Sequence, residues 1–150
     1  MRKLKQLILA VVIFMTCGVA FAINFNPVHQ YPQFVSWEVE GSATQPIEFP
    51  RGETKNMYFC ATAPCDISDL DIRIEITTMG VTHAVSLPKE SKGYLHNCEL
   101  PFKEGDVLYV QLPIKISTTA PLISSQFTIK LSNEVKKPIA GGSCDFYITK

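Results

Sequence analysis

The feature that most constrains the fold is the run DLDIRIEIT, residues 69–77, in which apolar and polar residues alternate strictly. A period of two residues is that of a β-strand with one buried face. The run DVLYVQLPIKIS, residues 106–117, repeats the pattern. The apolar sides of the two runs carry Leu70, Ile72, Ile74 and Ile76, and Leu108, Val110, Leu112, Ile114 and Ile116. No segment keeps a helical period over ten or more residues, so we expect an all-β chain.

Five shorter runs also have the composition of strands: residues 34–40, 55–60, 79–87, 125–132 and 144–150. Segments rich in Gly, Pro, Asn and Ser separate them and predict turns. Seven or eight short strands at this spacing are typical of an antiparallel β-sandwich or barrel, here in one domain. Pro113 lacks the N–H that a sheet ladder needs, which predicts an edge, a bulge or a bend in its strand.

The first 22 residues have the layout of a secretory signal peptide. A basic start precedes an apolar stretch from Leu7 to Met15 and a small-residue cleavage site at Ala20 to Ala22. An uncleaved signal anchor is the alternative, although a membrane span needs about 20 apolar residues. We therefore expect residues 1–22 to be cleaved and residues 23–150 to form one exported domain. Cleavage removes three of the fourteen basic residues and no acidic residue, so the net charge becomes −3, which argues against nucleic-acid binding.

Four cysteines remain in the expected mature chain: Cys60, Cys65, Cys98 and Cys144. An even number in an exported protein favours disulfides. Cys60 and Cys65 have four residues between them, whereas a redox motif has two. Cys98 and Cys144 are too far apart in the sequence to form a second metal-binding pair, so we expect no zinc site. Among the three possible connectivities we favour Cys60–Cys65, across one turn, and Cys98–Cys144, which closes a longer loop.

The sequence offers no support for catalysis, for a metal or for a cofactor. His29, His83 and His96 are far apart, and none has a histidine or carboxylate at metal-ligand spacing. A nucleophile motif of the form G-x-S-x-G is also missing. His83 is in register with the apolar residues of its run, which fits either a hydrogen-bonded core or rim histidine or an acid-sensitive group near a pocket. We expect a binding protein and not an enzyme.

Three motifs occur in an order and spacing that resemble the ML lipid-recognition family, and most of all its Niemann–Pick type C sterol-carrier branch. They are Met79-Gly80-Val81, Asn97-Cys98 and Leu112-Pro113-Ile114-Lys115, and the resemblance extends from about Val35 to the C-terminus. The family cysteines that usually pair with those at positions 98 and 144 are missing here. This departure favours the pairing of Cys98 with Cys144.

The resemblance implies an immunoglobulin-like sandwich with an apolar cavity between the sheets. Family ligand contacts fall on Val85, Ile114 and Thr118, and the last of these replaces a usual aromatic residue. Trp37 and Tyr58 are possible further contacts or packing residues at a sandwich end. The pocket that we predict from the strand faces and the resemblance together is lined by Leu70, Ile72, Ile74, Ile76, Val81, Val85, Leu108, Val110, Leu112, Ile114, Ile116, Thr118, Phe127, Ile129 and Phe146.

The resemblance also implies a monomeric protein of the extracellular space or the endosomal or lysosomal lumen that sequesters and transfers a sterol or another lipid. Fatty acids and phospholipids are further possible ligands, and transient contact with a membrane or a receptor is implied as well. Two alternatives remain open: recognition of microbial lipid in innate immunity, and a protein-binding sandwich with a filled core. The Ile, Leu and Val faces of the strands suit a cavity and a filled core equally, because both need apolar inner surfaces.

Overall fold

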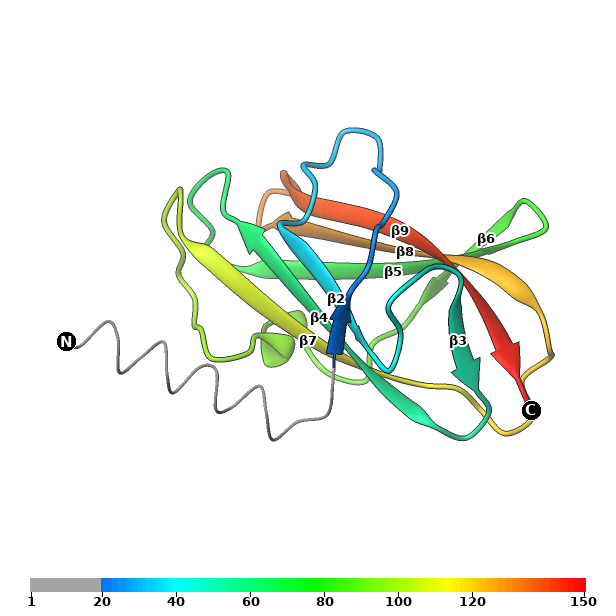
Figure 1. Cartoon of the computed structure of the whole chain (residues 1–150). Coiled ribbons are helices and arrows are strands. Elements are labelled where there is room, and N and C mark those ends of the chain that lie inside the picture. The colour runs from blue at the N-terminus through cyan, green and yellow to red at the C-terminus, as the bar shows by residue number, and fades with distance from the viewer. Residues whose placement is uncertain (1–19) are drawn as a thin grey trace.

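The structure is a computed structural model that describes residues 20–150, which form two β-sheets packed face to face (Figure 1). Most of the expected signal peptide, residues 1–19, lies outside the described part of the chain. The four-stranded sheet has the order β1 (Ala20–Ala22), β2 (Ser36–Glu40), β4 (Thr54–Thr62), β7 (Val107–Lys115). The five-stranded sheet has the order β3 (Ile47–Pro50), β9 (Pro138–Thr149), β8 (Ser124–Asn133), β5 (Leu70–Thr78), β6 (Val81–Val85).

The predicted all-β sandwich is confirmed, with one exception to the antiparallel rule. β3 pairs with β9 in parallel, and the chain crosses from the first sheet to the second between β2 and β3. A short 3-10 turn, η1 (Ser91–Tyr94), lies between β6 and β7. Among residues 20–150, no helix has the length and apolar character that a membrane span requires.

The strand alternation read from the sequence sets which side chains are buried. Along β5 and β7 the alternate residues that begin at Leu70 and at Leu108 face the other sheet, while their neighbours, including the exposed Val107 and Tyr109, face outward. β7 is an edge strand, as the proline in it predicts. Tyr109 points its N–H and C=O away from β4, toward Cys98 and His96. Pro113, four residues further on, has the same orientation, so its missing N–H costs the sheet no hydrogen bond.

The N-terminal segment before β2 closes one side of the sandwich. Asn26 and Gln33 bridge to β9 at Ser143 and Gly141, so the segment crosses from one sheet to the other. It carries two phenylalanines into an aromatic cluster with ring centroids 4.8–6.3 Å apart, made of Phe25, Phe34, Trp37, Phe59 and Phe127. The sequence pattern gave no sign of this covering segment.

Candidate functional site

Nine of the fifteen predicted pocket residues lie in one buried cluster between the sheets. Each has at most 6% of its surface exposed. They are Leu70, Ile72, Ile74, Leu108, Val110, Leu112, Phe127, Ile129 and Phe146. In this structure the two inner faces therefore pack directly on each other, and the interior is closed along most of its length.

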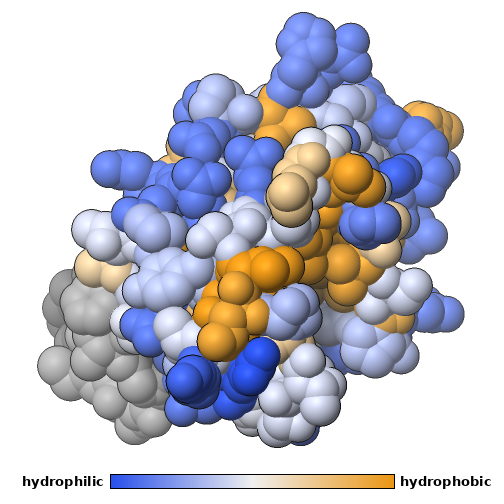
Figure 2. Space-filling model, turned by 90° about the vertical axis from the view of Figure 1, so that its right-hand side faces the viewer, coloured by the Kyte–Doolittle hydropathy of each residue, from blue (hydrophilic) through white to orange (hydrophobic). Residues whose placement is uncertain are grey.

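The remaining predicted residues mark an end of the sandwich that is less well covered. Ile76, Ile114 and Ile116 are partly buried against the core, whereas Val81 and Val85 are 55% and 40% exposed and Thr118 is exposed. We call the group Ile76, Val81, Val85, Leu87, Ile114, Ile116 and Ile148 the apolar end. Figure 2 views the molecule from this side and shows hydrophobic side chains gathered across it.

The hairpin formed by β5 and β6 builds one wall of the apolar end. Ile74 pairs with Val85, Ile76 with His83 and Thr78 with Val81, so these side chains share the inner face of the sheet. β6 is the edge strand of its sheet, and all five of its residues are exposed. Because even the inward-facing residues of β6 are exposed, the four-stranded sheet does not cover the inner face of the other sheet at β6.

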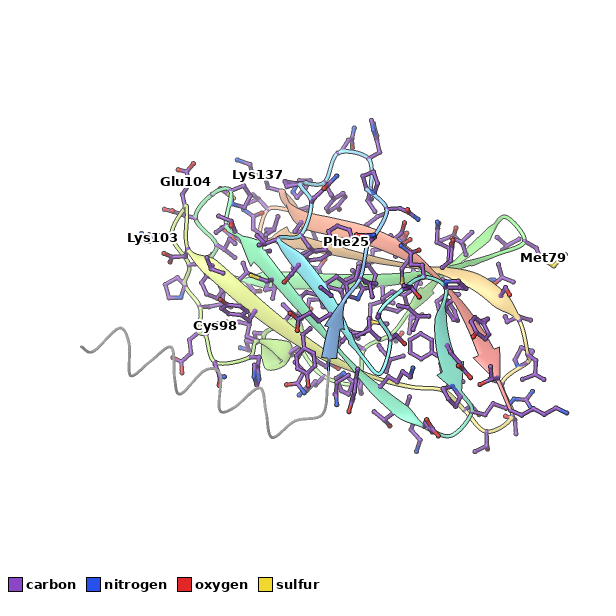
Figure 3. The ribbon with its side chains drawn as sticks, viewed as in Figure 1. Phe25, Met79, Cys98, Lys103, Glu104 and Lys137 are labelled. Carbon is purple, nitrogen blue, oxygen red and sulfur yellow. The ribbon has the colours of Figure 1, made fainter. Side chains whose placement is uncertain are left out.

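The tip of the hairpin projects beyond the sandwich. Met79 and Gly80 form its two-residue turn, with φ of +51° and +79°. The strand expected over residues 79–87 is therefore shorter, Val81–Val85, because these two residues turn the chain. Met79 is 97% exposed and stands far from the end where Lys103, Glu104 and Lys137 lie (Figure 3). The thirteen residues from Ile76 to Pro88 include no Asp, Glu, Lys or Arg. The β5–β6 hairpin is therefore uncharged from Ile76 onward, and its tip lies far from these three charged residues.

Few polar side chains lie on the inner face of the five-stranded sheet, and two of them lie at the apolar end. Thr78 Oγ1 and Ser125 Oγ form a hydrogen bond to each other, and Ser125 is buried. His83 lies next to them on the inner face of the hairpin but is exposed, which fits the rim position considered from the sequence. Trp37 is buried among aromatic rings, and Tyr58 faces outward, 6.4 Å from the His96 ring. Tyr58 is thus no pocket residue.

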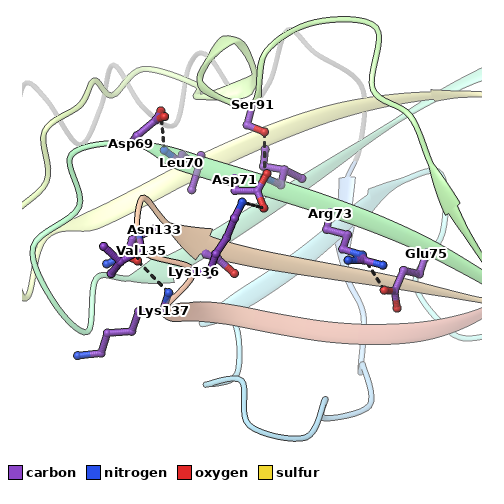
Figure 4. A network of polar contacts seen from close by, with 12 residues as sticks. Asp69, Leu70, Asp71, Arg73, Glu75, Ser91, Asn133, Val135, Lys136 and Lys137 are labelled. Carbon is purple, nitrogen blue, oxygen red and sulfur yellow. Dashed lines mark hydrogen bonds and ion pairs between the residues drawn. The ribbon is translucent and has the colours of Figure 1, made fainter.

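A separate pocket of about 370 Å³ opens on the surface, outside the sandwich interior. Its lining is Asp69, Leu70, Glu90, Ser91 and Lys92. Figure 4 shows the polar contacts around it: Ser91 Oγ accepts a hydrogen bond from the Ile72 N–H, and Lys136 pairs with Asp71. The first contact attaches η1 to β5, and the second attaches the turn between β8 and β9 to the same strand. The mostly polar and charged lining does not suit a hydrocarbon.

The four cysteines are free thiols in this structure, so neither predicted disulfide is formed in it. Cys60 lies inside β4, not at its end, and alternates with the inward-facing residues, so its side chain faces outward. Cys65, in the connection between β4 and β5, accepts a hydrogen bond from Asn133 Nδ2 at 3.6 Å and thus lies at the end of β8. Cys98 Sγ contacts the Tyr109 backbone at 3.4 Å, beside the edge of β7. Cys144 is fully buried within β9, where burial raises the pKa of its thiol.

No protein-family model and no curated protein matches the chain. Solved structures do. A Niemann–Pick type C2 protein from the Japanese carpenter ant superposes with a TM-score of 0.76 at 13% identity, covering 84% of this chain and 99% of the other. Chicken MD-1, complexed with lipid IVa, gives a TM-score of 0.53 at 15% identity, with 85% and 96% covered. The C-terminal domain of wzt gives 0.55 at 12% identity, covering 79% of this chain and 73% of the other. The resemblance expected from the sequence motifs is therefore confirmed at the level of the fold, which is the β-sandwich of the Niemann–Pick type C2 and MD-1 proteins.

Proposed function

We propose that this protein binds a lipid, with the hydrocarbon held between the two sheets and inserted through the apolar end. The observation that carries the proposal is the continuity of two apolar surfaces. The buried inner faces lead without an intervening charged side chain to the exposed Val81 and Val85 of the β5–β6 hairpin. An exposed, uncharged apolar surface of this kind marks an interaction site on a soluble domain. The fold shared with a lipid-bound MD-1 supports the same ligand class.

Binding requires the sheets to separate, since the interior is closed in this structure. A buried methylene contributes about 0.8 kcal/mol, so a chain of about 16 carbons contributes about 12 kcal/mol before the cost of association. The cost of opening is smallest at the apolar end, where Ile76, Ile114 and Ile116 are already partly exposed. It is largest at the aromatic cluster, where five rings interlock. The ligand therefore enters at the apolar end and reaches toward Leu112 and Phe146.

A sterol or a fatty-acid-sized lipid fits this route better than a lipid with many acyl chains, because only one end of the interior opens at low cost. Export through the signal peptide places the protein in the extracellular space or in the endosomal or lysosomal lumen. There it sequesters and transfers lipid as a monomer, with passing contact to a membrane or a receptor. No catalytic step is part of this function, which is a physical exchange of the lipid between water or bilayer and a dry interior.

Extraction of the purified protein with organic solvent tests the proposal directly. Mass spectrometry of the extract is expected to show one lipid species at close to one molecule per protein, and the empty protein is expected to take up a fluorescent sterol or fatty acid. An extract without lipid, together with no uptake of either probe, would overturn the proposal.

A protein-binding sandwich with a filled core is the second candidate. It is favoured by the low exposure of the inner side chains, which is 0–6% for the nine buried residues of the predicted pocket. In that case the exposed hairpin would contact a protein, and no lipid would enter. The uptake measurement separates the two functions.

A further inference from the structure

The corner between β3 and β4 places two cationic side chains next to the apolar end. Phe49 is a buried residue of β3, and Arg51 follows it by two residues in the turn before β4. Lys55 lies on β4 and alternates with Met57 and Phe59, so it belongs to the inner face of the sheet. Its pairing partner on β7 is Ile114, a member of the apolar end. A lysine on an inner face, opposite a pocket residue, is an unusual position for a charge.

Lys55 is held at this corner by two contacts. Its Nζ lies 3.1 Å from Ser42 Oγ and 5.9 Å from the centroid of the Phe49 ring. Gly41 also lies beside the ammonium, since a Cβ built on it would stand 3.9 Å from Nζ. The Phe49 ring packs edge-on against Phe146 at 5.5 Å, which connects the corner to the buried interior.

Neither cation has an acidic partner among the described residues. The ion pairs of residues 20–150 involve other lysines and arginines: Arg73, Lys92, Lys103, Lys130 and Lys136. Two neighbouring carboxylates are engaged elsewhere, since Glu40 accepts hydrogen bonds from Asn56 and Glu48 accepts one from Thr149. Arg51 Nε is buried and has no hydrogen-bond partner.

An unpaired donor of this kind is costly unless something binds it. A buried polar group without a partner costs about 1–3 kcal/mol, and more when it is charged. Guanidinium and ammonium groups donate their strongest hydrogen bonds to anionic oxygens. An anion at this corner would use the buried Nε of Arg51 and the ammonium of Lys55, while a hydrocarbon attached to it would pass Ile114 and enter the interior.

We infer that Lys55, beside the Phe49 ring, and Arg51, two residues after Phe49 in the chain, bind the anionic end of the lipid, and that this end is the carboxylate of a long-chain fatty acid. The inference rests on the proposed function and specifies its ligand. A carboxylate has two oxygens, one for each cation, and leaves the rest of the ligand free to be hydrocarbon. The ammonium and guanidinium therefore select an acid over the alcohol of the same length.

Binding of hexadecanoic acid and of hexadecanol to the full chain tests the inference at neutral pH, where the acid is ionised. The wild-type protein is expected to bind the acid more tightly. Lys55→Met and Arg51→Met are each expected to weaken binding of the acid about 10- to 100-fold, the loss of one charge-assisted hydrogen bond, while binding of hexadecanol stays within about threefold. Lys55→Arg keeps the charge and is expected to keep the preference for the acid.

Lys115→Met is the matched control. Lys115 follows Ile114 on β7 and is exposed on the outer face, so its removal is expected to change neither affinity. Retained hexadecanol binding also shows that each variant is folded. Three outcomes would each overturn the inference. The wild type could bind acid and alcohol equally, Lys55→Met could weaken binding of both equally, or acetate could compete at the same concentration as the fatty acid. Tighter binding of hexadecyl phosphate than of the acid would overturn the assignment to a carboxylate. If the wild type binds none of these lipids, the proposed function itself fails.

Discussion

Replacing Ile114 with Trp distinguishes an interior that opens for a ligand from one that is permanently filled. Ile114 is partly buried at the apolar end, and Leu112 lies two residues before it on the same face of β7 with 1% exposure. An indole at position 114 can project from the uncovered end, so we expect Ile114→Trp to change the free energy of unfolding by less than about 1 kcal/mol. The same ring at position 112 meets a closed interior, where overpacking typically costs about 1–3 kcal/mol.

If the ligand enters at the apolar end, Ile114→Trp should affect mainly ligand uptake and Leu112→Trp mainly the free energy of unfolding. Ile114→Trp is expected to weaken uptake of a fluorescent fatty acid more than tenfold while urea unfolding stays near that of the wild type. Leu112→Trp is expected to lower the free energy of unfolding. Val135→Trp serves as the control, because Val135 is 75% exposed in the turn between β8 and β9. Normal uptake by Ile114→Trp, or a loss of about 3 kcal/mol of stability in that variant, would refute the reasoning and favour a filled core.

Three further predictions follow from single positions. Gly142→Ala is expected to destabilise the fold by about 1–3 kcal/mol in urea denaturation, because its Cβ would lie 2.9 Å from the Phe25 ring; a change below about 0.5 kcal/mol would show that the ring moves aside freely. In the reduced protein, the raised pKa of Cys144 means that the folded state keeps a proton that the unfolded chain releases. Stability should therefore fall above about pH 8.5, with at most about 1.4 kcal/mol per pH unit from this thiol, and Cys144→Ala should reduce the slope. A part of the slope should remain, because burial also raises the pKa of Cys60. Expression in a secreting host is expected to yield a protein that begins at Ile23, and an intact-mass measurement that retains residues 1–22 would contradict the predicted cleavage.

Cleavage after Ala22 has a structural consequence that the same protein preparation can reveal. It would remove β1, which pairs with β2. The hydrogen bond from the Ile23 N–H to the Trp37 carbonyl, 2.9 Å, belongs to the remaining chain. β2 would thus keep its hydrogen bond to Ile23 after β1 is removed. Because the rest of the sandwich is unchanged, we expect the mature domain to unfold in a single cooperative step.

The sequence predicted the strands and their faces well wherever the pattern is local. Alternation along β5 and β7 identified their buried residues, because side chains of a strand point to opposite faces at every step. Pro113 marked an edge strand for an equally local reason. Phe59 was missed as a core residue, although it alternates with Met57 and Ala61 in the same way and could have been found.

Alternation could not tell whether an inner face is covered. Val85 and Ile74 are cross-strand partners with the same orientation, yet one is 40% exposed and the other 1%. The difference arises because β6 extends past the opposing sheet, and the position of one sheet over another depends on the whole chain. Lys55 was overlooked for a related reason, since a charged residue in a strand is ordinarily read as facing water.

The sequence by itself determined an all-β chain with two long amphipathic strands and the motifs that resemble a lipid-recognition family, because strand period and motif spacing are properties of neighbouring residues. Only the tertiary structure decided the parallel pairing of β3 with β9, the covering role of Phe25 and Phe34, and the surroundings of the four free cysteines. It also decided that the apolar faces close on each other everywhere except at the apolar end. These features depend on contacts between residues far apart in the chain, and their free energy comes from packing that no local pattern encodes.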